Sequence, residues 1–178
     1  MKHSLATTLT GSYKTTAQHT GKKHSASLTS TAPVTPDFIA TQARAIRKAI
    51  VRMLSQSQSG HSAGALGMAD VFATLYFGVL QHDPKNPHWE ERDRVILSNG
   101  HICPVLYATL AQAGYFPKTL LKTLRQLNSP LQGHPHFLAQ PHSGAQREQP
   151  PHPPQLPGLE NTSGPLAQGL SQAIGRAS

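Results

Sequence analysis

Residues 92–101 read Arg92-Asp93-Arg94-Val95-Ile96-Leu97-Ser98-Asn99-Gly100-His101. The charged start leads into a short apolar, largely β-branched run at 95–97, which predicts a buried strand. A small polar turn ends that strand, so His101 falls just beyond it. Because ligands in open α/β sheets bind outside the carboxyl ends of strands, we expect His101 to lie at a ligand site. An imidazole there can donate to a phosphate oxygen or transfer a proton near neutral pH.

Helical patterns precede this stretch. Apolar residues spaced alternately by four and three predict an amphipathic helix over residues 37–57, capped by Thr35 or Asp37. Residues 68–80 are apolar over nearly the whole circumference, which predicts a helix buried between layers. The residues that need cover there are Val71, Phe72, Leu75, Tyr76 and Val79.

Two further helices are predicted after His101. Residues 104–113 have a helical pattern that ends at Gly114, in agreement with the preference for glycine just beyond a helix. Residues 117–127 begin with a proline and carry leucines along one side. The alternation of helices with a buried strand favours the α/β class.

Residues 163–166 read Ser163-Gly164-Pro165-Leu166 and lead into helical spacing over residues 166–177. Ser163 could cap this helix, and Pro165 could take its first turn. A helix that begins at Gly164 and Pro165 presents free backbone N–H groups and the positive end of its dipole, and Gly164 lets a ligand approach the backbone closely. Phosphate or diphosphate is the expected occupant.

Two more clusters place histidines on loops, namely Ser59-Gly60-His61 and Gly133-His134-Pro135-His136. Taken alone, a Gly-His pair is most often a solvated turn, and Gly-Pro usually only shapes the start of a helix. A metal site at His134 and His136 is disfavoured because no Cys or carboxylate stands at ligand spacing. Cys103, at the start of an apolar helix, is expected in the core rather than as a nucleophile. We predict that His61, His101 and His134 line one pocket.

Composition limits where the folded part lies. The chain has 178 residues, of which only 37% are hydrophobic, and 15 are prolines. We therefore expect a disordered, basic, Ser/Thr-rich tail at residues 1–36 and a folded domain at 37–178. A low-complexity insertion rich in Pro, His and Gln is expected at 137–156.

The formal net charge is +8, and residues 1–36 hold four lysines and no acidic residue. Nucleic acid, an anionic membrane surface and an organellar address all suit a basic tail, and a phosphorylated substrate suits the central surplus. Nucleic acid is disfavoured because aromatic residues are not interleaved with the basic ones. No secretory signal or membrane-spanning run is visible. The single cysteine fits a reducing compartment, so a cytoplasmic location without membrane attachment is expected.

As a series, these motifs resemble transketolase, and more narrowly the N-terminal subunit of the split bacterial form. The resemblance covers residues 38–177, apart from the insertion. It is carried by the histidine clusters and residues 92–101 quoted above, together with Leu66-Gly67-Met68-Ala69-Asp70, Asp83-Pro84-Lys85-Asn86-Pro87, Pro157-Gly158-Leu159-Glu160 and Ser163-Gly164-Pro165-Leu166-Ala167-Gln168-Gly169.

The resemblance implies an enzyme of the pentose phosphate pathway that uses thiamin diphosphate and Mg²⁺ to move a two-carbon ketol unit between sugar phosphates. It implies catalytic roles for three histidines: His61 and His134 contact substrate, and His101 contacts the cofactor diphosphate and the substrate. It also implies that Gly164, Pro165 and Leu166 lie against the cofactor. The implied fold is part of a thiamin diphosphate-binding α/β domain, a parallel sheet with helices on both faces.

The departures from the family pattern set a second expectation. Ala167 replaces a usual Gly, and the printed sequence contains neither the Gly-Asp-Gly motif that holds the metal nor the pyrimidine-binding domain. We therefore expect weak cofactor binding by this chain alone and activity only with a C-terminal, pyrimidine-binding partner subunit. An incomplete sheet would expose an edge and apolar surface, so association into oligomers is expected. The alternative is a truncated, non-catalytic remnant or interaction module.

Overall fold

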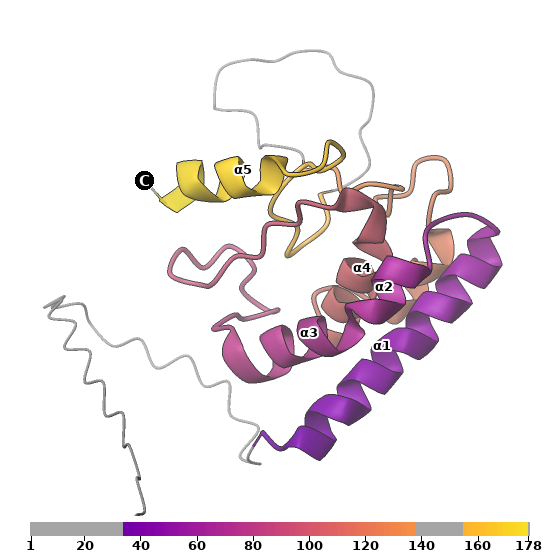
Figure 1. Ribbon diagram of the computed structural model, residues 1–178, viewed down its shortest axis with the longest axis horizontal. Helices are drawn as coiled ribbons and strands as arrows, with labels where there is room; N and C mark the ends of the chain where they lie inside the picture. The colour runs from indigo at the N-terminus through magenta and orange to yellow at the C-terminus, as the bar shows by residue number, and fades with distance from the viewer. Residues whose placement is uncertain (1–33, 138–154, 178) are drawn as a thin grey trace, which may run out of the picture.

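The computed structural model describes residues 34–137 and 155–177 of the chain (Figure 1). Most of the expected tail and of the expected insertion therefore lies outside the described residues. The last residue of each segment belongs to the folded part. Pro36, at the end of the expected tail, begins α1, and Leu156, at the end of the expected insertion, is buried in the core. No helix in the described ranges is long and apolar enough to cross a membrane.

The long helix α1, Pro36–Ser57, confirms the first predicted helix. Thr35 is its N-cap, and its Oγ1 accepts a hydrogen bond from the N–H of Phe38 at 3.2 Å. This bond satisfies one of the free donors at the start of the helix. The buried residues recur at spacings of three and four, so one face of α1 packs into the core: Ala43, Ile46, Ile50 and Met53.

Residues 68–80 do not form one uniformly buried helix. The short helices α2, Ala63–Gly67, and α3, Ala69–Thr74, are followed by a π-helical turn, η1, Leu75–Val79. Phe72 and Tyr76 lie in the core, but Val71 is exposed and Val79 is 63% exposed. The prediction that residues 68–80 are buried on all sides was wrong. The helices α1 and α4 pack against part of this segment, and no described element covers the rest.

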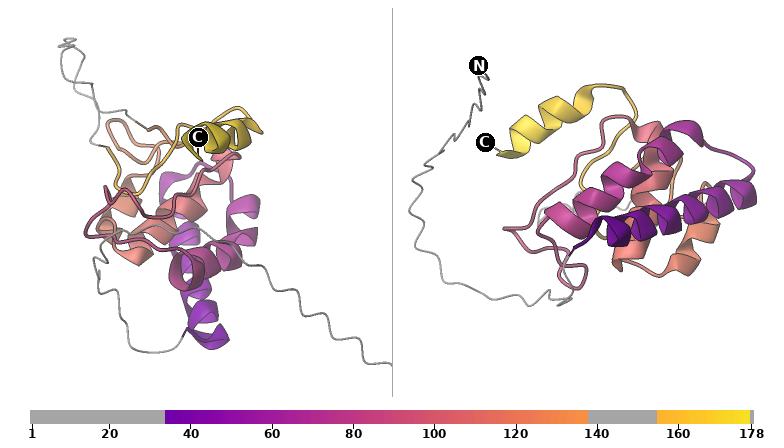
Figure 2. Two further views of the ribbon diagram at one scale, coloured as in Figure 1. Left: turned by 90° about the vertical axis from the view of Figure 1, so that its left-hand side faces the viewer. Right: turned by 60° about the horizontal axis from the view of Figure 1, so that its bottom comes forward.

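The core centres on α4, Cys103–Ala113, which follows a 3₁₀ turn, η2, Gly100–Ile102. Residues 103–111 are all buried, and α1, α2 and α3 pack against α4 (Figure 2). The predicted end at Gly114 is confirmed: Gly114 is left-handed at φ 97°, and its N–H donates to the carbonyl of Leu110 at 3.0 Å. α4 therefore fixes the loop that carries His101 directly to the core.

The predicted helix at 117–127 is only a 3₁₀ segment, η3, Lys118–Thr123. Leu121 and Leu124 are buried as the pattern requires, whereas Leu127 is 92% exposed. The segment ends early because Leu124 turns to an extended backbone with ψ 127° and Arg125 to a left-handed one with φ 59°, and neither conformation continues a right-handed helix.

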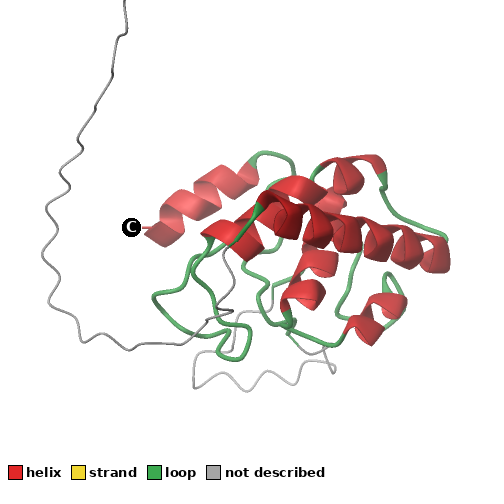
Figure 3. Ribbon diagram, turned by 90° about the horizontal axis from the view of Figure 1, so that it is seen from below, coloured by secondary structure: helices red, strands yellow, loops and turns green. Residues whose placement is uncertain are grey.

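The predicted strand at 95–97 is not formed, and the described residues contain no strand (Figure 3). A strand needs a neighbour to take its backbone hydrogen bonds. Here the backbone of Leu97 instead bonds the side chain of Asn161, whose Oδ1 accepts from the Leu97 N–H at 3.0 Å and whose Nδ2 donates to the Leu97 carbonyl at 3.0 Å. The described part is thus helices joined by irregular segments, and the predicted sheet is not observed in it.

The last helix, α5, Gln168–Ala177, starts later than predicted. Ala167 has φ 70°, so helical backbone cannot extend back to Gly164 and Pro165. Ser163 does not cap the helix; its hydroxyl donates to the carbonyl of Ser98 at 3.3 Å. The irregular segment around Leu97 and Ser98 lies between α5 and the other helices (Figure 1).

Gly158 holds the chain that leads to α5 close against α4. Its φ is 79°, and a Cβ there would lie 2.7 Å from the Tyr115 ring and 2.8 Å from Leu110 Cδ2. We therefore expect Gly158→Ala to lower the free energy of unfolding by about 2–4 kcal/mol, from strain and overpacking together. Urea unfolding followed by circular dichroism measures the loss.

The matched control is Gly175→Ala on α5, where a Cβ would meet nothing within 4 Å. Alanine favours a helix over glycine by roughly 0.5–1 kcal/mol, so this variant should be at least as stable as the original chain. Equal stabilities of the Gly158→Ala and Gly175→Ala variants would contradict the close packing described for Gly158.

Candidate functional site

His61 and His101 meet edge to face, with ring centroids 5.3 Å apart and planes at 68°. His61 comes from the loop between α1 and α2, and His101 from η2. His61 is exposed, while His101 is half-buried. They lie in a narrow recess whose lining residues are Gly60, His61, His101, Cys103, Pro104, Leu124, Arg125 and Gly133.

Gly100 brings two other segments to this loop. A Cβ on Gly100 would lie 2.7 Å from Ser163 Oγ and 3.0 Å from His134 Cδ2, so a side chain here would force its neighbours apart. The loops that carry His101, His134 and Ser163 therefore meet at one point although they are far apart in sequence.

His134 lies in an adjoining open cleft of about 530 Å³. The cleft is lined by Asn128, Gln132, Gly133, His134, Pro135, His136, Thr162 and Ser163. His134 is exposed there, and Gly133 lines both the cleft and the recess of His61 and His101. The structure thus pairs the first two predicted histidines in one recess and places the third beside it; their chemical roles remain predictions.

Buried polar groups hold the loop that carries His134. The Cys103 thiol donates to the carbonyl of Gly133 at 3.2 Å, and the Tyr107 hydroxyl donates to the carbonyl of Gln132 at 2.9 Å. Burial raises the pKa of the Cys103 thiol to about 12, although the Tyr107 hydroxyl and the Arg125 charge act against it. Cys103 is therefore a core residue, as expected, and a donor that orients the loop.

The predicted anion site at Gly164 and Pro165 has a different geometry. These residues form a surface turn before α5, and a Cβ on Gly164 would meet no atom within 4 Å. The prediction that a helix begins here was wrong, since Ala167 interrupts the helical backbone. In addition, the N–H of Gly169 in the first turn of α5 donates to Ser98 Oγ at 3.1 Å. Leu166 is also exposed.

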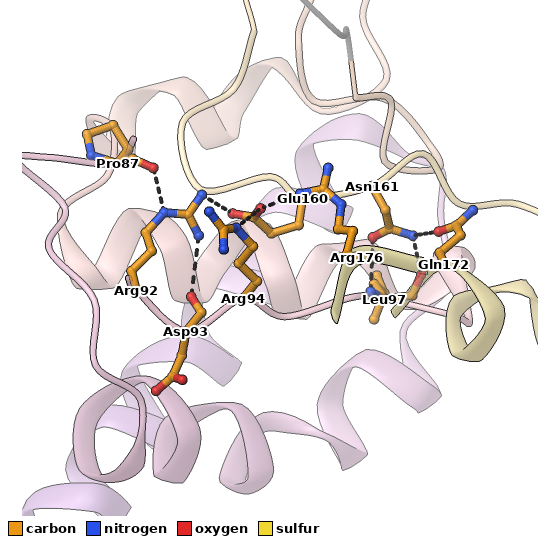
Figure 4. A network of polar contacts seen from close by, with 9 residues as sticks. All are labelled: Pro87, Arg92, Asp93, Arg94, Leu97, Glu160, Asn161, Gln172 and Arg176. Carbon is orange, nitrogen blue, oxygen red and sulfur yellow. Dashed lines mark hydrogen bonds and ion pairs between the residues drawn. The ribbon is translucent and has the colours of Figure 1, made fainter. Parts of the chain in front are cut away.

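A buried polar network beside the site was not predicted (Figure 4). Glu160 is only 4% exposed, and its carboxylate pairs with Arg92 at 2.6 Å and Arg176 at 3.5 Å. The neighbouring Asn161 donates to Gln172 Oε1 at 2.8 Å besides bonding Leu97. Little in the sequence indicated this network, because the arginine partners of Glu160 are 16 or more residues away from it.

Metal ligands do not gather in the described ranges, where no group of three His, Cys, Asp or Glu residues is placed to hold an ion. The donors near His61 and His101 are imidazoles and the Arg125 guanidinium, with no carboxylate among the lining residues. This set suits an anion rather than a cation.

Comparison with known proteins identifies the family of this chain. Residues 39–178 match the family model of a thiamine diphosphate binding domain, that of transketolase. The chain belongs to this transketolase family. Transketolase of Buchnera aphidicola is 43% identical over 136 residues, and transketolase 2 of Escherichia coli is 40% identical. Each match covers 76% of this chain and 18% of the relative.

Solved transketolases resemble this structure over the matched region. The structure from Leishmania mexicana superimposes with a TM-score of 0.67 at 35% identity, and the Pichia stipitis complex with sedoheptulose-7-phosphate with a TM-score of 0.66 at 34%. Both matches cover 78% of this chain and 18% of the other. The chain thus spans about one-fifth of the length of these relatives.

The raised pKa of Cys103 predicts a slow thiol. With a folded pKa of about 12 and an ordinary value near 8.5, the thiolate is scarce in the folded chain at pH 9 but abundant in the unfolded chain. We expect iodoacetamide at pH 9 to alkylate the folded chain at least about 100-fold more slowly than the chain in urea.

Mass spectrometry over a time course measures both alkylation rates, and free glutathione in the same buffers controls for the effect of urea on the reagent. Similar rates for the folded and unfolded chains would contradict the buried, hydrogen-bonded thiol.

Proposed function

We propose that this chain is the thiamin diphosphate-binding N-terminal section of a transketolase, which transfers a two-carbon ketol unit between sugar phosphates together with a partner chain. The observation that carries the proposal is that, in a chain of this family, the His61 ring meets the His101 ring while the His134 loop packs against Gly100 beside them. Sugar phosphates are proposed as substrates because the Pichia stipitis transketolase was solved with sedoheptulose-7-phosphate.

The side chains at the site have the chemistry to bind the anionic part of the cofactor. In this proposal His101 donates to the diphosphate and to substrate, while His61 and His134 contact substrate. Gly164, Pro165 and Leu166 form an open surface turn that leaves room for the cofactor to lie against them. When bound, thiamin diphosphate would supply the carbon nucleophile, and the imidazoles would hold and move protons at the substrate oxygens. Ligands for Mg²⁺ are proposed to come from outside the described ranges.

A partner is proposed from the surface of α5. Leu170 and Ile174 are 70% and 63% exposed and lie four residues apart on α5, so they form one apolar stripe, and Leu166, which is 65% exposed, lies in the turn before the helix. Polar contacts hold the other side of the helix: Gly169 bonds Ser98, and Gln172 bonds Asn161. An apolar stripe that faces away from its own domain fits a polypeptide partner.

The occupant we propose is the pyrimidine-binding C-terminal subunit of the same enzyme, because the resemblance to transketolase implies such a domain beside the thiamin diphosphate-binding one. The second candidate is a non-catalytic interaction module. It is favoured by one observation, the exposed apolar side chains of Leu170 and Ile174 on α5.

Calorimetric titration with thiamin diphosphate and Mg²⁺, with the chain alone and mixed with a candidate C-terminal subunit, tests the proposal. We expect binding and ketol transfer in the mixture only. His101→Ala should then weaken cofactor binding by about tenfold or more, since it removes a hydrogen bond to a charged group. His88→Ala, on an exposed loop, is the matched control and should leave binding unchanged. Tight association of the two chains without cofactor binding would favour the interaction module.

The stripe gives a separate prediction. Leu170→Asp places a charge on an exposed apolar position, so it should weaken association with the C-terminal subunit by at least about tenfold without unfolding the chain. Leu127→Asp is the control, because Leu127 is 92% exposed and lies outside α5. Analytical ultracentrifugation of the mixtures measures association. Undiminished association of the Leu170→Asp variant would show that the partner binds elsewhere.

A further inference from the structure

Arg125 lines the recess of His61 and His101, but the sequence motifs did not identify it as a site residue. Its backbone is left-handed, with φ 59°, and its N–H donates to the carbonyl of Leu131 at 2.8 Å. A non-glycine residue in this conformation costs roughly 1–2 kcal/mol, and such strain persists where the surrounding structure determines it. The turn thus holds the Arg125 side chain in a direction that an ordinary helix end would not give.

The guanidinium lies against the backbone of Gly133. A Cβ on Gly133 would stand 2.9 Å from Arg125 Nη1 and 3.1 Å from its Cζ, so the guanidinium occupies the space that a side chain would take. Gly133 also lines the cleft of His134, and its carbonyl is held by the Cys103 thiol. Arg125 therefore stands where the histidine recess and the cleft adjoin.

The charge of Arg125 is not neutralised within the described part of the chain. Arg47 pairs with Asp70 and Arg92 pairs with Glu160, but no carboxylate in the described ranges forms an ion pair with Arg125. None of the residues that line the recess is acidic. A guanidinium beside two imidazoles, without a carboxylate, has the chemistry of a receptor for an oxyanion.

We propose that Arg125 is an anion-binding residue of this site and that its guanidinium, with His61 and His101, binds a phosphate group. The inference rests on the proposed function, because that function supplies the ligands with phosphate groups, thiamin diphosphate and sugar phosphates. The planar guanidinium can donate two parallel hydrogen bonds to a phosphate, so it would orient the phosphate as well as attract its negative charge. The phosphate can belong to the cofactor diphosphate or to a sugar phosphate, and the experiment separates these sources.

The test titrates the whole chain with inorganic pyrophosphate and follows the imidazole signals of His61 and His101 by NMR. Arg125→Asn removes the charge with a residue that tolerates the left-handed backbone. Gly133→Ala keeps the charge but displaces the guanidinium, since the added Cβ would clash with it. We expect both variants to weaken pyrophosphate binding by about tenfold or more, and Arg125→Lys to lose less because it retains the charge.

Two controls match these changes. Arg52→Gln removes a positive charge from the exposed side of α1, and Gly67→Ala adds a Cβ that meets no atom within 4 Å. Both should bind pyrophosphate as the original chain does, and thermal melts confirm that every variant is folded. The proposal is overturned if the original chain does not bind pyrophosphate, if Arg125→Asn binds it equally well, or if Arg52→Gln weakens binding as much as Arg125→Asn.

Two comparisons in the mixture with the C-terminal subunit identify the source of the phosphate: binding of thiamin diphosphate against binding of thiamin, and binding of a sugar phosphate against binding of its free sugar. Dependence on Arg125 should appear for the phosphorylated member of one pair. The reconstituted pair of chains separates this inference from the proposed function. Pyrophosphate binding that needs Arg125, without ketol transfer in the mixture, would leave the inference standing and reject the enzyme. Ketol transfer with unchanged kcat and KM in Arg125→Asn would reject the inference alone.

Discussion

The arrangement of the loops depends on how the buried backbone of Leu97 is satisfied. Buried N–H and C=O groups without partners are costly, and a neighbouring strand normally supplies them. Here the Asn161 amide does so, because it carries an acceptor for the Leu97 N–H and a donor for the Leu97 carbonyl. Aspartate would lack the donor and leucine both groups. Since Asn161 also bonds Gln172, the same side chain fixes α5 against the segment that leads to His101.

Glu160 reinforces this link with charge. A carboxylate that is 4% exposed requires compensation, and Arg92, Arg94 and Arg176 surround it at 2.6–3.7 Å. Arg92 is itself anchored, since its Nε donates to the carbonyl of Pro87 at 2.6 Å. Such a pair adds less to stability than its Coulomb attraction suggests, because both charges lose water. Its effect here is positional: it joins the segment before Leu97 to the end of α5.

Local signals in the sequence predicted the local features. The period of α1, its Thr35 cap and the Gly114 end of α4 were correct because each depends on residues within a few positions. The strand at 95–97 needs a neighbour elsewhere in the chain, and the late start of α5 depends on the backbone of Ala167, so periodicity could not reveal either. For the site, the motifs indicated His61 and His101, which do meet. They missed Arg125, whose position depends on a left-handed turn and on the absence of a side chain at Gly133.

The two halves of the proposed site differ in what holds them. The recess around His101 and Arg125 is supported by contacts within the described chain: Cys103 and Tyr107 bond the carbonyls at 132 and 133, and Gly100 packs against Ser163. By contrast, the turn at 164–166 and the stripe on α5 face outward with few contacts. In the proposed site, a phosphate would therefore need donors from this chain alone, since His101 and Arg125 are already held in place. Enclosure of the rest of the cofactor would need a second surface, which in the proposal packs on the apolar face of α5.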